Sequence, residues 1–502
     1  MLDGRRLVIV VTFIAIFAMA VRTPIDPDGW WHLATGRWIV QEGRIPHQDP
    51  FSHTMAGQPW VDNGWLPQIA LYLAYRLLGM AGVGLLVALQ ATLALAFLWP
   101  QMRGGVFPRA FLLVFAATVS SPVWTPRPQM TTYLFTALLT FLLHRYRVQE
   151  DRRALYPIPL LFVLWVNAHA GYVLGLLLLG LSFLGEVLER LWKERGQLTV
   201  RLWRPWLLTS LAALLVVPLN PYGPRMWSYP FYNAGQRFAR QYIAEWASPD
   251  FHQLHNQPLI WMVLLILAVL GLSRRPPPLA DLLNLLAFTY LTFQSQRAMG
   301  LFALVATPLL SASLSQLRGW SDERKGLQRS GALTDTPGTV QRWRGQGALN
   351  VGIVIVLLLA ALTKAYVALS PETLAQAERE QGFPADALAW LRQERPSAPL
   401  FNPYNWGGYL IWHLYPDYRV FVDGRADLYG DDFLFQYAQV ALAKPGWEAI
   451  LDRYGVQTAL VEAKSPLVGA MAASPAWEPL YEDGRALVFR RKRTAGRPPT
   501  ED

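Results

Sequence analysis

The sequence contains a series of long apolar stretches, several of which approach the roughly 20 residues that a helix needs to cross a bilayer. The stretch over residues 7–21 comes first, and residues 349–367 form the last. Hydrophobic residues occupy 53% of the 502 positions and charged residues only 16%, whereas soluble proteins have about 25% charged residues. This pattern predicts a polytopic α-helical membrane protein and excludes an ordinary soluble domain.

We predict a bundle of about 11 transmembrane helices, with no cleaved signal peptide before them. They lie over residues 7–22, 81–100, 107–123, 129–145, 155–168, 171–189, 205–219, 257–273, 279–294, 297–314 and 349–367. The apolar residues 65–78 are short and contain Pro67, Gln68 and Arg76. We therefore expect them to form a juxtamembrane helix in the interface rather than a span.

This arrangement divides the loops into an arginine-rich set and an arginine-poor set. The rich set includes Arg5, Arg6, Arg103, Arg147, Arg190, Arg274 and Arg275, and the poor set has only scattered arginines such as Arg127, Arg225, Arg237 and Arg297. Loops rich in Lys and Arg stay in the cytoplasm. The predicted location is the cell (plasma or inner) membrane, with a cytoplasmic N-terminus and an extracytoplasmic C-terminal domain.

The charge distribution argues against a nucleic-acid-binding protein, and the cysteine content excludes sites built from cysteine. The net charge is +10, but the arginines flank apolar spans and do not form a soluble basic face, which argues against nucleic-acid binding. The chain has no cysteine, which excludes disulfides and thiolate metal sites.

The predicted domains are a transmembrane module over residues 1–367 and a small extracytoplasmic α/β domain over residues 368–502. The module includes outer segments at residues 23–80 and 220–256 and a cytoplasmic linker at residues 315–348, rich in Gly, Ser, Arg and Thr. In the C-terminal region Ser370-Pro-Glu marks a helix start. Expected strands lie near residues 400–401, 420–422, 458–461 and 487–489, and a helical stretch covers residues 447–454.

The first outer segment opens with Asp26-Pro-Asp28, immediately after an apolar helix. Pro27 favours an extended backbone at Asp26, and in an extended segment residues i and i+2 face the same way. Two such carboxylates can share a divalent cation, or one can act as general base. The alternative is structural, because Asp28 precedes a helical stretch over residues 29–42 and is a good N-cap residue.

Aromatic residues and a histidine accompany this motif. Tryptophans at a membrane surface usually serve as anchors, but one or two of them, such as Trp31, are candidates for stacking on a sugar. His32 is a candidate metal ligand or proton carrier, with a hydrogen-bonded structural role as the alternative.

Polar residues at the outer ends of other spans supply further candidates. Arg127 and Arg297 suit bidentate binding of a phosphate or pyrophosphate, or alternatively extend to lipid headgroups. Asn167 and His169 either bind an acceptor or close a helix end. The segment over residues 220–256 adds Arg237 as a candidate phosphate ligand and Glu245 as a candidate sugar or acceptor ligand.

The C-terminal region contains Phe421-Val-Asp-Gly-Arg-Ala-Asp-Leu-Tyr-Gly, which is dense in turn-forming and aromatic residues. Its Asp423, Arg425 and Asp427 could bind a glycan or an anion. A buried Asp–Arg pair that fixes a loop is the preferred interpretation.

The order of these elements resembles the GT-C superfamily of integral membrane glycosyltransferases, such as protein O-mannosyltransferases and aminoarabinose transferases. The resemblance rests on the first span, the acidic Asp26-Pro-Asp28 motif, Asp49-Pro-Phe-Ser, and Gln58-Pro-Trp ahead of the second span, and it covers roughly residues 1–315. It implies a polyprenyl-phosphate or -pyrophosphate sugar donor. It also implies an outer-loop aspartate, Asp28 or Asp26, as base or as ligand of Mg²⁺ or Mn²⁺, with Arg127 or Arg297 at the donor phosphate.

The predicted function is therefore an inverting hexosyl- or pentosyltransferase of the cell envelope, with a glycan, lipid or protein as acceptor. The C-terminal region has no Trp-Trp-Asp block, which disfavours N-glycosylation. One alternative is a transporter or flippase of a lipid-linked glycan, for which the spans offer few ionisable residues. Another is a non-catalytic membrane assembly protein.

Overall fold

The computed structural model describes residues 2–193, 200–328 and 346–492. Its contacts divide the chain into two compact units. The first unit consists of Met1–Arg22, Gly84–Pro230 and Ile243–Leu369, and the second of Thr23–Val83, Phe231–Tyr242 and Ser370–Asp502. The first outer segment thus groups with the C-terminal region, whereas the sequence-based division placed it with the transmembrane helices.

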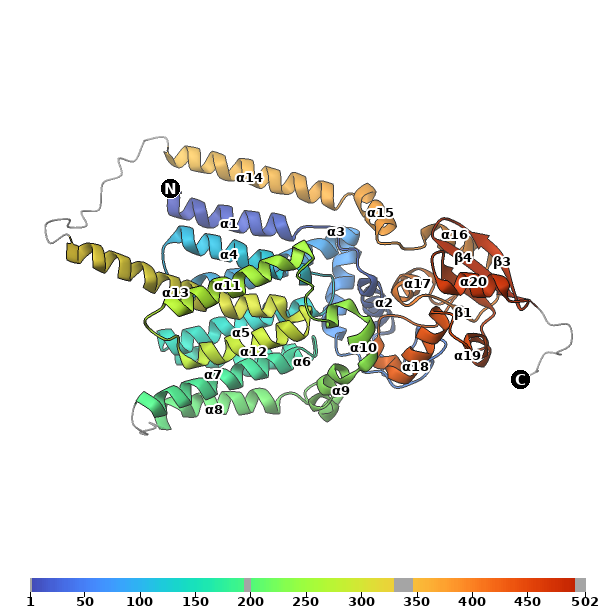
Figure 1. Cartoon of the computed structure of the whole chain (residues 1–502), viewed down its shortest axis with the longest axis horizontal. Helices are drawn as coiled ribbons and strands as arrows, with labels where there is room; N and C mark the ends of the chain where they lie inside the picture. The colour runs from blue at the N-terminus through green and yellow to red at the C-terminus, as the bar shows by residue number, and fades with distance from the viewer. Residues whose placement is uncertain (1, 194–199, 329–345, 493–502) are drawn as a thin grey trace. The chain divides into compact units, whose positions relative to one another are not determined.

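The first unit is a bundle of helices, many of which run side by side in Figure 1. Its members are α1 (Gly4–Ala20), α4 (Val106–Ser120), α5 (Gln129–Gln149), α6 (Ile158–Val166), α7 (Tyr172–Lys193), α8 (Val200–Leu215), α11 (Gln257–Leu272), α12 (Leu279–Gln294), α13 (Met299–Gln328), α14 (Gln346–Ala368) and the later part of α3 (Trp65–Leu98). Helix α1 packs on α4 and α14, and α12 packs on α7 and α13. Large apolar side chains remain exposed on α11 and α14, such as Leu267 and Val356. Such outward-facing apolar surface is typical of helices in contact with lipid.

Each of the eleven predicted spans coincides with a helix of the structure. Six helical segments among the described residues are long and apolar enough to cross a membrane, namely Trp65–Gln101, Val106–Val123, Tyr172–Trp192, Leu254–Leu272, Gln296–Leu317 and Gln346–Ala368. Membrane crossing by the remaining helices, including the nine-residue α6, stays a prediction. The predicted linker over residues 315–348 is partly helical, because α13 continues to Gln328 and α14 begins at Gln346. Residues 329–345 of that linker lie outside the described residues.

Helix α3 is interrupted where the sequence predicts the end of an interfacial helix. Leu78 and Gly79 leave the helical conformation, and Gly79 has φ 61° and ψ −151°, a region that is essentially restricted to glycine. The break separates an earlier helix, near the predicted residues 65–78, from the second predicted span.

The second unit combines helices with a four-stranded sheet in the order β1-β2-β4-β3. Strand β1 (Leu400–Phe401) pairs in parallel with β2 (Thr458–Glu462), and β4 (Ala486–Arg491) lies antiparallel to both β2 and β3 (Trp477–Glu482). The helices of this unit are α2 (Pro27–Glu42), α10 (Arg237–Tyr242), α15 (Pro371–Glu380), α16 (Ala385–Glu394), α17 (Gly407–Leu414), α18 (Ala426–Ala441), α19 (Trp447–Arg453) and α20 (Pro466–Ala473), with α9 (Tyr229–Gly235) at its boundary.

Three of the four predicted strands are present in this sheet. The exception is residues 420–422, where Val420 forms an isolated bridge with Ser52 of the first outer segment. Sequence reasoning missed β3, an edge strand that contains Pro479, as edge strands can. The predicted helix start at Ser370 is confirmed, because its hydroxyl accepts the Thr373 N–H at 3.2 Å.

Candidate functional site

The acidic motif lies at the start of α2 in the second unit. Asp26 is extended, with φ −152° and ψ 135°, and its Oδ1 accepts the backbone N–H groups of Asp28 and Gly29 at 2.9 and 3.0 Å. The helix begins at Pro27, a favoured first helical residue. The predicted cap at Asp28 is therefore wrong, since Asp26 is the cap, and the extended stretch assumed from Asp26 to Asp28 does not exist. The two carboxylates consequently have different surroundings.

The carboxylate of Asp28 lies against a glycine of the C-terminal region. A Cβ atom built at Gly424 would lie 1.8 Å from Oδ1 of Asp28 and 3.0 Å from Nε1 of Trp31. At Gly408, the second residue of α17, a Cβ atom would lie 2.6 Å from the carbonyl oxygen of Pro27. Only glycine permits so close an approach. The C-terminal region therefore helps to position the start of α2.

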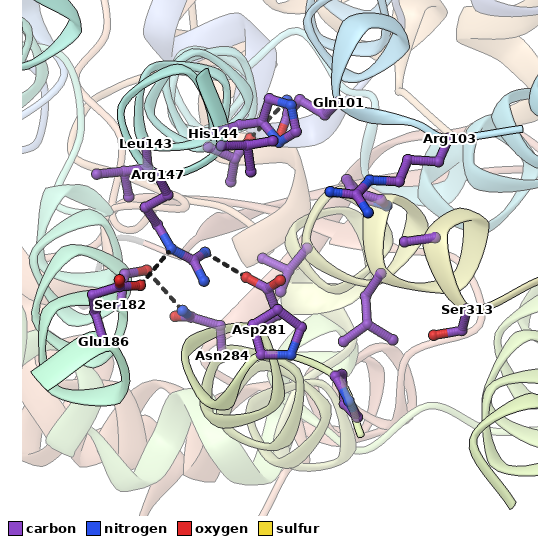
Figure 2. Close-up of a pocket in the computed structure, with 18 of the residues that line it drawn as sticks. Gln101, Arg103, Leu143, His144, Arg147, Ser182, Glu186, Asp281, Asn284 and Ser313 are labelled. Atoms are coloured by element: carbon purple, nitrogen blue, oxygen red, sulfur yellow. Dashed lines mark hydrogen bonds and ion pairs between the residues drawn. The ribbon is translucent and has the colours of Figure 1, made fainter. Parts of the chain in front are cut away.

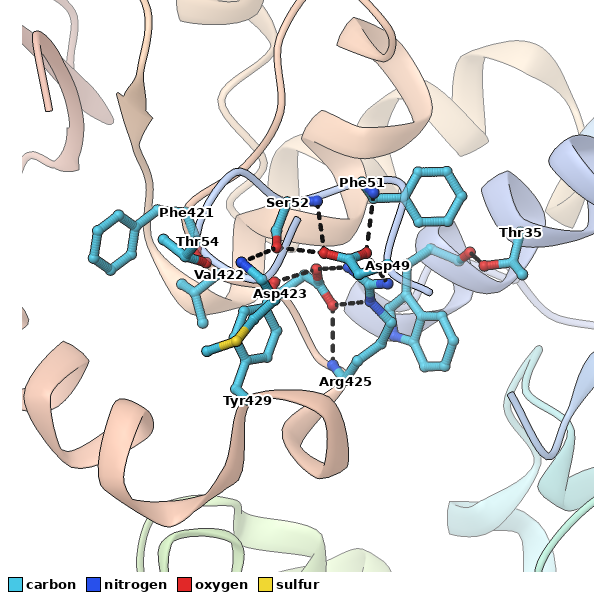
Figure 3. Close-up of polar contacts among 12 residues, drawn as sticks. Thr35, Asp49, Phe51, Ser52, Thr54, Phe421, Val422, Asp423, Arg425 and Tyr429 are labelled. Carbon is cyan, nitrogen blue, oxygen red and sulfur yellow. Dashed lines mark hydrogen bonds and ion pairs between the residues drawn. The ribbon is translucent and has the colours of Figure 1, made fainter. Parts of the chain in front are cut away.

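A buried ion network fixes the loop that contains Gly424 (Figure 3). Arg425, with no exposed side-chain surface, donates from Nη1 to Oδ1 of Asp49 and from Nη2 to Oδ2 of Asp423, each at 2.6 Å. The Tyr429 hydroxyl donates to the same Asp423 oxygen at 2.7 Å. Burial alone would lower the pKa of Arg425, but Asp423 and Asp49 raise it well above its usual value. The preferred interpretation of a buried Asp–Arg pair is confirmed, and Asp49 is an additional partner.

His32 belongs to a second buried polar cluster in this unit. The Gln68 side-chain amide donates to Oδ1 of Asp62 at 2.8 Å and lies 3.1 Å from Nδ1 of His32. The rings of Trp31 and His32 are 3.5 Å apart between centroids. Burial raises the pKa of Asp62 to about 7, against the opposing effect of hydrogen bonds from Gln68 and Gly64. His32 is hydrogen-bonded, as the structural alternative expected, and sugar stacking by Trp31 stays a prediction.

The first unit brings together two predicted arginines and one predicted acid. Arg127 donates from Nη1 to both carboxylate oxygens of Glu245 at 3.0 Å. Nη2 of Arg297 is 3.3 Å from Oε1 of Glu245, and its guanidinium lies over the Trp246 ring at 4.9 Å. The side chains of Arg127, Glu245 and Arg297 are 12%, 25% and 32% exposed. We call these three residues the arginine cluster.

Hydrogen bonds between the segments around two short helices hold the arginine cluster in place. Glu245 lies in η5 (Ala244–Trp246) and Arg297 in η7 (Gln296–Ala298). The Ser295 hydroxyl donates to the carbonyl oxygen of Glu245 at 2.9 Å, and the Gln296 N–H donates to that of Ala247 at 3.0 Å. Burial acts to raise the pKa of Glu245, but Arg297 and Arg127 lower it below its usual value. With Glu245 ionised, the cluster keeps one net positive charge.

His169 and Asn167 lie in the turn between α6 and α7 of the same unit. Nδ1 of His169 accepts the Gly171 N–H at 3.1 Å and lies 2.9 Å from the Thr132 hydroxyl. Burial, assisted by Arg297, lowers the pKa of His169 to about 3, so the ring is neutral, and the network places its proton on Nε2. The Asn167 amide donates to the carbonyl oxygens of Val163 and Leu219, both at 2.8 Å, which closes the end of α6.

The remaining candidates are Arg237 and the possible metal ligands Asp26 and Asp28. Arg237 belongs to the second unit, where its Nε lies 3.6 Å from Oδ2 of Asp431 and its side chain is 78% exposed. Binding of the donor phosphate by Arg237 stays a prediction. Among the described residues no group of three or more His, Asp or Glu side chains is placed to hold a metal ion. Oδ1 of Asp26 serves as a helix cap. Metal binding at Asp26 and Asp28 stays a prediction.

No protein-family model and no curated protein sequence matches this chain. Solved structures do match it. The archaeal oligosaccharyltransferase AglB from Archaeoglobus fulgidus, in complex with an inhibitory peptide and a dolichol-phosphate, is similar with a TM-score of 0.59 and 12% identity over 91% of this chain and 69% of its own. ArnT from Cupriavidus metallidurans bound to undecaprenyl phosphate is similar with a TM-score of 0.51 and 14% identity over 98% of both chains. These likenesses confirm the fold that the resemblance to the GT-C superfamily implied.

Proposed function

We propose that this chain, which has the GT-C fold, is an integral membrane glycosyltransferase that uses a polyprenyl-phosphate or -pyrophosphate sugar donor at the outer face of the membrane. The arginine cluster is the observation that carries this proposal. Two structures of the same fold, AglB and ArnT, hold a dolichol-phosphate and an undecaprenyl phosphate. A partly buried cationic cluster in this chain supplies the chemistry that such a phosphate requires.

The composition of the cluster suits an anion. Each guanidinium has five N–H donors in a planar fork, so Arg127 and Arg297 together have more donors than the Glu245 carboxylate can accept. Glu245 holds both guanidinium groups in position before a ligand arrives, and the net positive charge remains. At side-chain exposures of 12% and 32%, water screens this charge less than it would screen a charge on an open surface.

In the proposed reaction, the acceptor hydroxyl oxygen attacks the anomeric carbon of the donor sugar while the bond from that carbon to the phosphate oxygen breaks. The configuration is inverted, the departing phosphate keeps the electron pair, and Arg127 and Arg297 stabilise its charge. Asp28 takes the proton of the acceptor hydroxyl. We assign this role to Asp28 because Asp26 is occupied as the cap of α2.

Two matched substitutions test the assignment of the base. Asp28→Asn removes the basic carboxylate and should lower sugar transfer by about 100-fold or more, the typical contribution of a general base. Asp26→Asn also removes a carboxylate, but asparagine caps a helix about as well as aspartate, so most of the activity should remain. Transfer is measured with purified protein and a radiolabelled polyprenyl-phosphate sugar. Full activity of a correctly folded Asp28→Asn protein would exclude Asp28 as the base.

A further inference from the structure

The first unit contains a cavity of about 620 Å³ (Figure 2). It is lined by the later part of α5, whereas Arg127 of the arginine cluster precedes the start of this helix. Its lining comes from side chains within residues 140–148 of α5, 178–190 of α7, 281–284 of α12 and 304–316 of α13, together with Gln101, Arg103 and residues 275–278 outside these helices. Arg127 precedes α5 and Arg147 lies near its end, and a helix of 21 residues is about 30 Å long. The charge distribution of the loops predicts that this end of the bundle is cytoplasmic.

The acids of the cavity are engaged by protein groups. Asp281 pairs with Arg147 at 2.5 Å, and Glu186 lies 3.5 Å from Arg147 and 2.9 Å from Arg190. Glu189 accepts the Leu279 N–H at 2.9 Å, at the start of α12. Figure 2 shows Arg147 between Glu186 and Asp281. The negative charge of the cavity is thus largely compensated from within.

Two further arginines leave an excess of positive charge. Arg103 and Arg275 also line the cavity, and neither forms a salt bridge within residues 2–193, 200–328 and 346–492. Both side chains are exposed. The cavity therefore has an excess of positive charge, which favours the binding of an anion.

The buried side-chain amide of Asn284 indicates a second property of the ligand, namely a hydrogen-bond donor. Asn284 is 5% exposed and lines the cavity. Its Nδ2 donates to the Ser182 hydroxyl and to the Ala280 carbonyl oxygen, each at 2.8 Å, whereas its Oδ1 is buried with no hydrogen-bond donor from the described protein. Buried acceptors usually have a donor, so a ligand with an O–H group fits this position.

We propose that the cavity is a second anion site, which binds a phosphate group that carries or adjoins a hydroxyl. The volume lies within the usual range for small-molecule sites, roughly 300–1,000 Å³. Arg103 and Arg275 bind the phosphate, and Asn284 accepts a hydrogen bond from the hydroxyl. The ligand is either the glycerol-phosphate headgroup of an anionic lipid or a free phosphate, since both have this chemistry.

The experiment measures binding to the full-length protein by native mass spectrometry, with dihexanoyl phosphatidylglycerol and inorganic phosphate as separate probes. The wild type should bind at least one probe, and Arg103→Gln with Arg275→Gln should weaken that binding at least tenfold. Arg274→Gln is the matched control, because Arg274 is adjacent to Arg275 in sequence and is not part of the cavity lining. Its affinity should stay within about twofold of the wild type.

The two probes distinguish the sources of the phosphate. Binding of phosphatidylglycerol at concentrations where inorganic phosphate does not bind would identify a lipid headgroup, and equal binding of both would identify the free anion. Binding of neither probe, or equal weakening by Arg274→Gln and the double substitution, would overturn the proposal. Sugar transfer is not a readout here, so the outcome is independent of the proposed enzymatic function.

Discussion

Replacement of Arg425 by methionine tests whether the buried ion network holds the second unit together. The substitution leaves Asp49 and Asp423, both fully buried, without their shared cation. Removal of one partner of a buried ion pair costs about 3–5 kcal/mol. Asp49 keeps the Phe51 and Ser52 N–H donors at 3.0 Å, and Asp423 keeps the Tyr429 hydroxyl. We therefore expect a loss of about 4 kcal/mol, a large part of the roughly 5–15 kcal/mol by which domains are stable.

Thermal unfolding in detergent, followed by tryptophan fluorescence and by proteolysis of the C-terminal region, measures this loss. Arg490→Met is the matched control in the same unit, because Arg490 pairs with Glu478 at the surface and is 51% exposed. Exposed pairs contribute only about 0–1 kcal/mol. If Arg425→Met unfolded at the same temperature as Arg490→Met, the network would not have the stabilising role assigned to it.

Two further predictions concern the acidic motif and a buried acid of the second unit. Gly424→Ala should displace the Asp28 carboxylate, since the new Cβ would lie 1.8 Å from Oδ1. This displacement should lower kcat for sugar transfer at least tenfold. Gly469→Ala is the control, because Gly469 has open space around it, and it should leave kcat unchanged. The pKa of Asp62 is raised to about 7 in the folded protein and is about 4 when unfolded. The folded state therefore holds a proton that the unfolded state releases, so stability should fall as the pH rises from about 4 to 7 and then level off. Thermal unfolding of Asp62→Asn at pH 5 and pH 8 should show a smaller fall than the wild type, and an equal fall would contradict this assignment.

The sequence predicted local structure better than contacts between distant segments. Helices occur at all eleven predicted positions because long apolar runs and their flanking arginines are local signals. The start of α2 was misplaced by two residues, because Asp26 and Asp28 are both good cap residues and the choice depends on Pro27 at the first helical position. Strand β3 was missed because Pro479 and the charged residues Glu478 and Glu482 conceal an edge strand.

The sequence predicted which residue types form the candidate site, but only some of the contacts between these residues. Arg127 and Arg297 were identified from their place at span ends, but the sequence gives no sign that Glu245 lies between them. Asp423 and Arg425 were expected to pair, because they are two residues apart. Their third partner, Asp49, is 376 residues from Arg425, and no periodicity connects positions so distant. Gly424 stood out only as a turn residue, whereas its close approach to Asp28 depends on the tertiary fold.

The affinity of the purified protein for undecaprenyl phosphate tests the proposed role of the arginine cluster most directly. Hydrogen bonds to charged groups contribute about 1.5–3 kcal/mol, so Arg127→Gln and Arg297→Gln should each raise the Kd by about 10- to 100-fold. Arg225→Gln, at an exposed arginine of the same unit, should bind like the wild type. Unchanged affinity in folded Arg127→Gln and Arg297→Gln proteins would contradict the proposal that this cluster binds the donor phosphate.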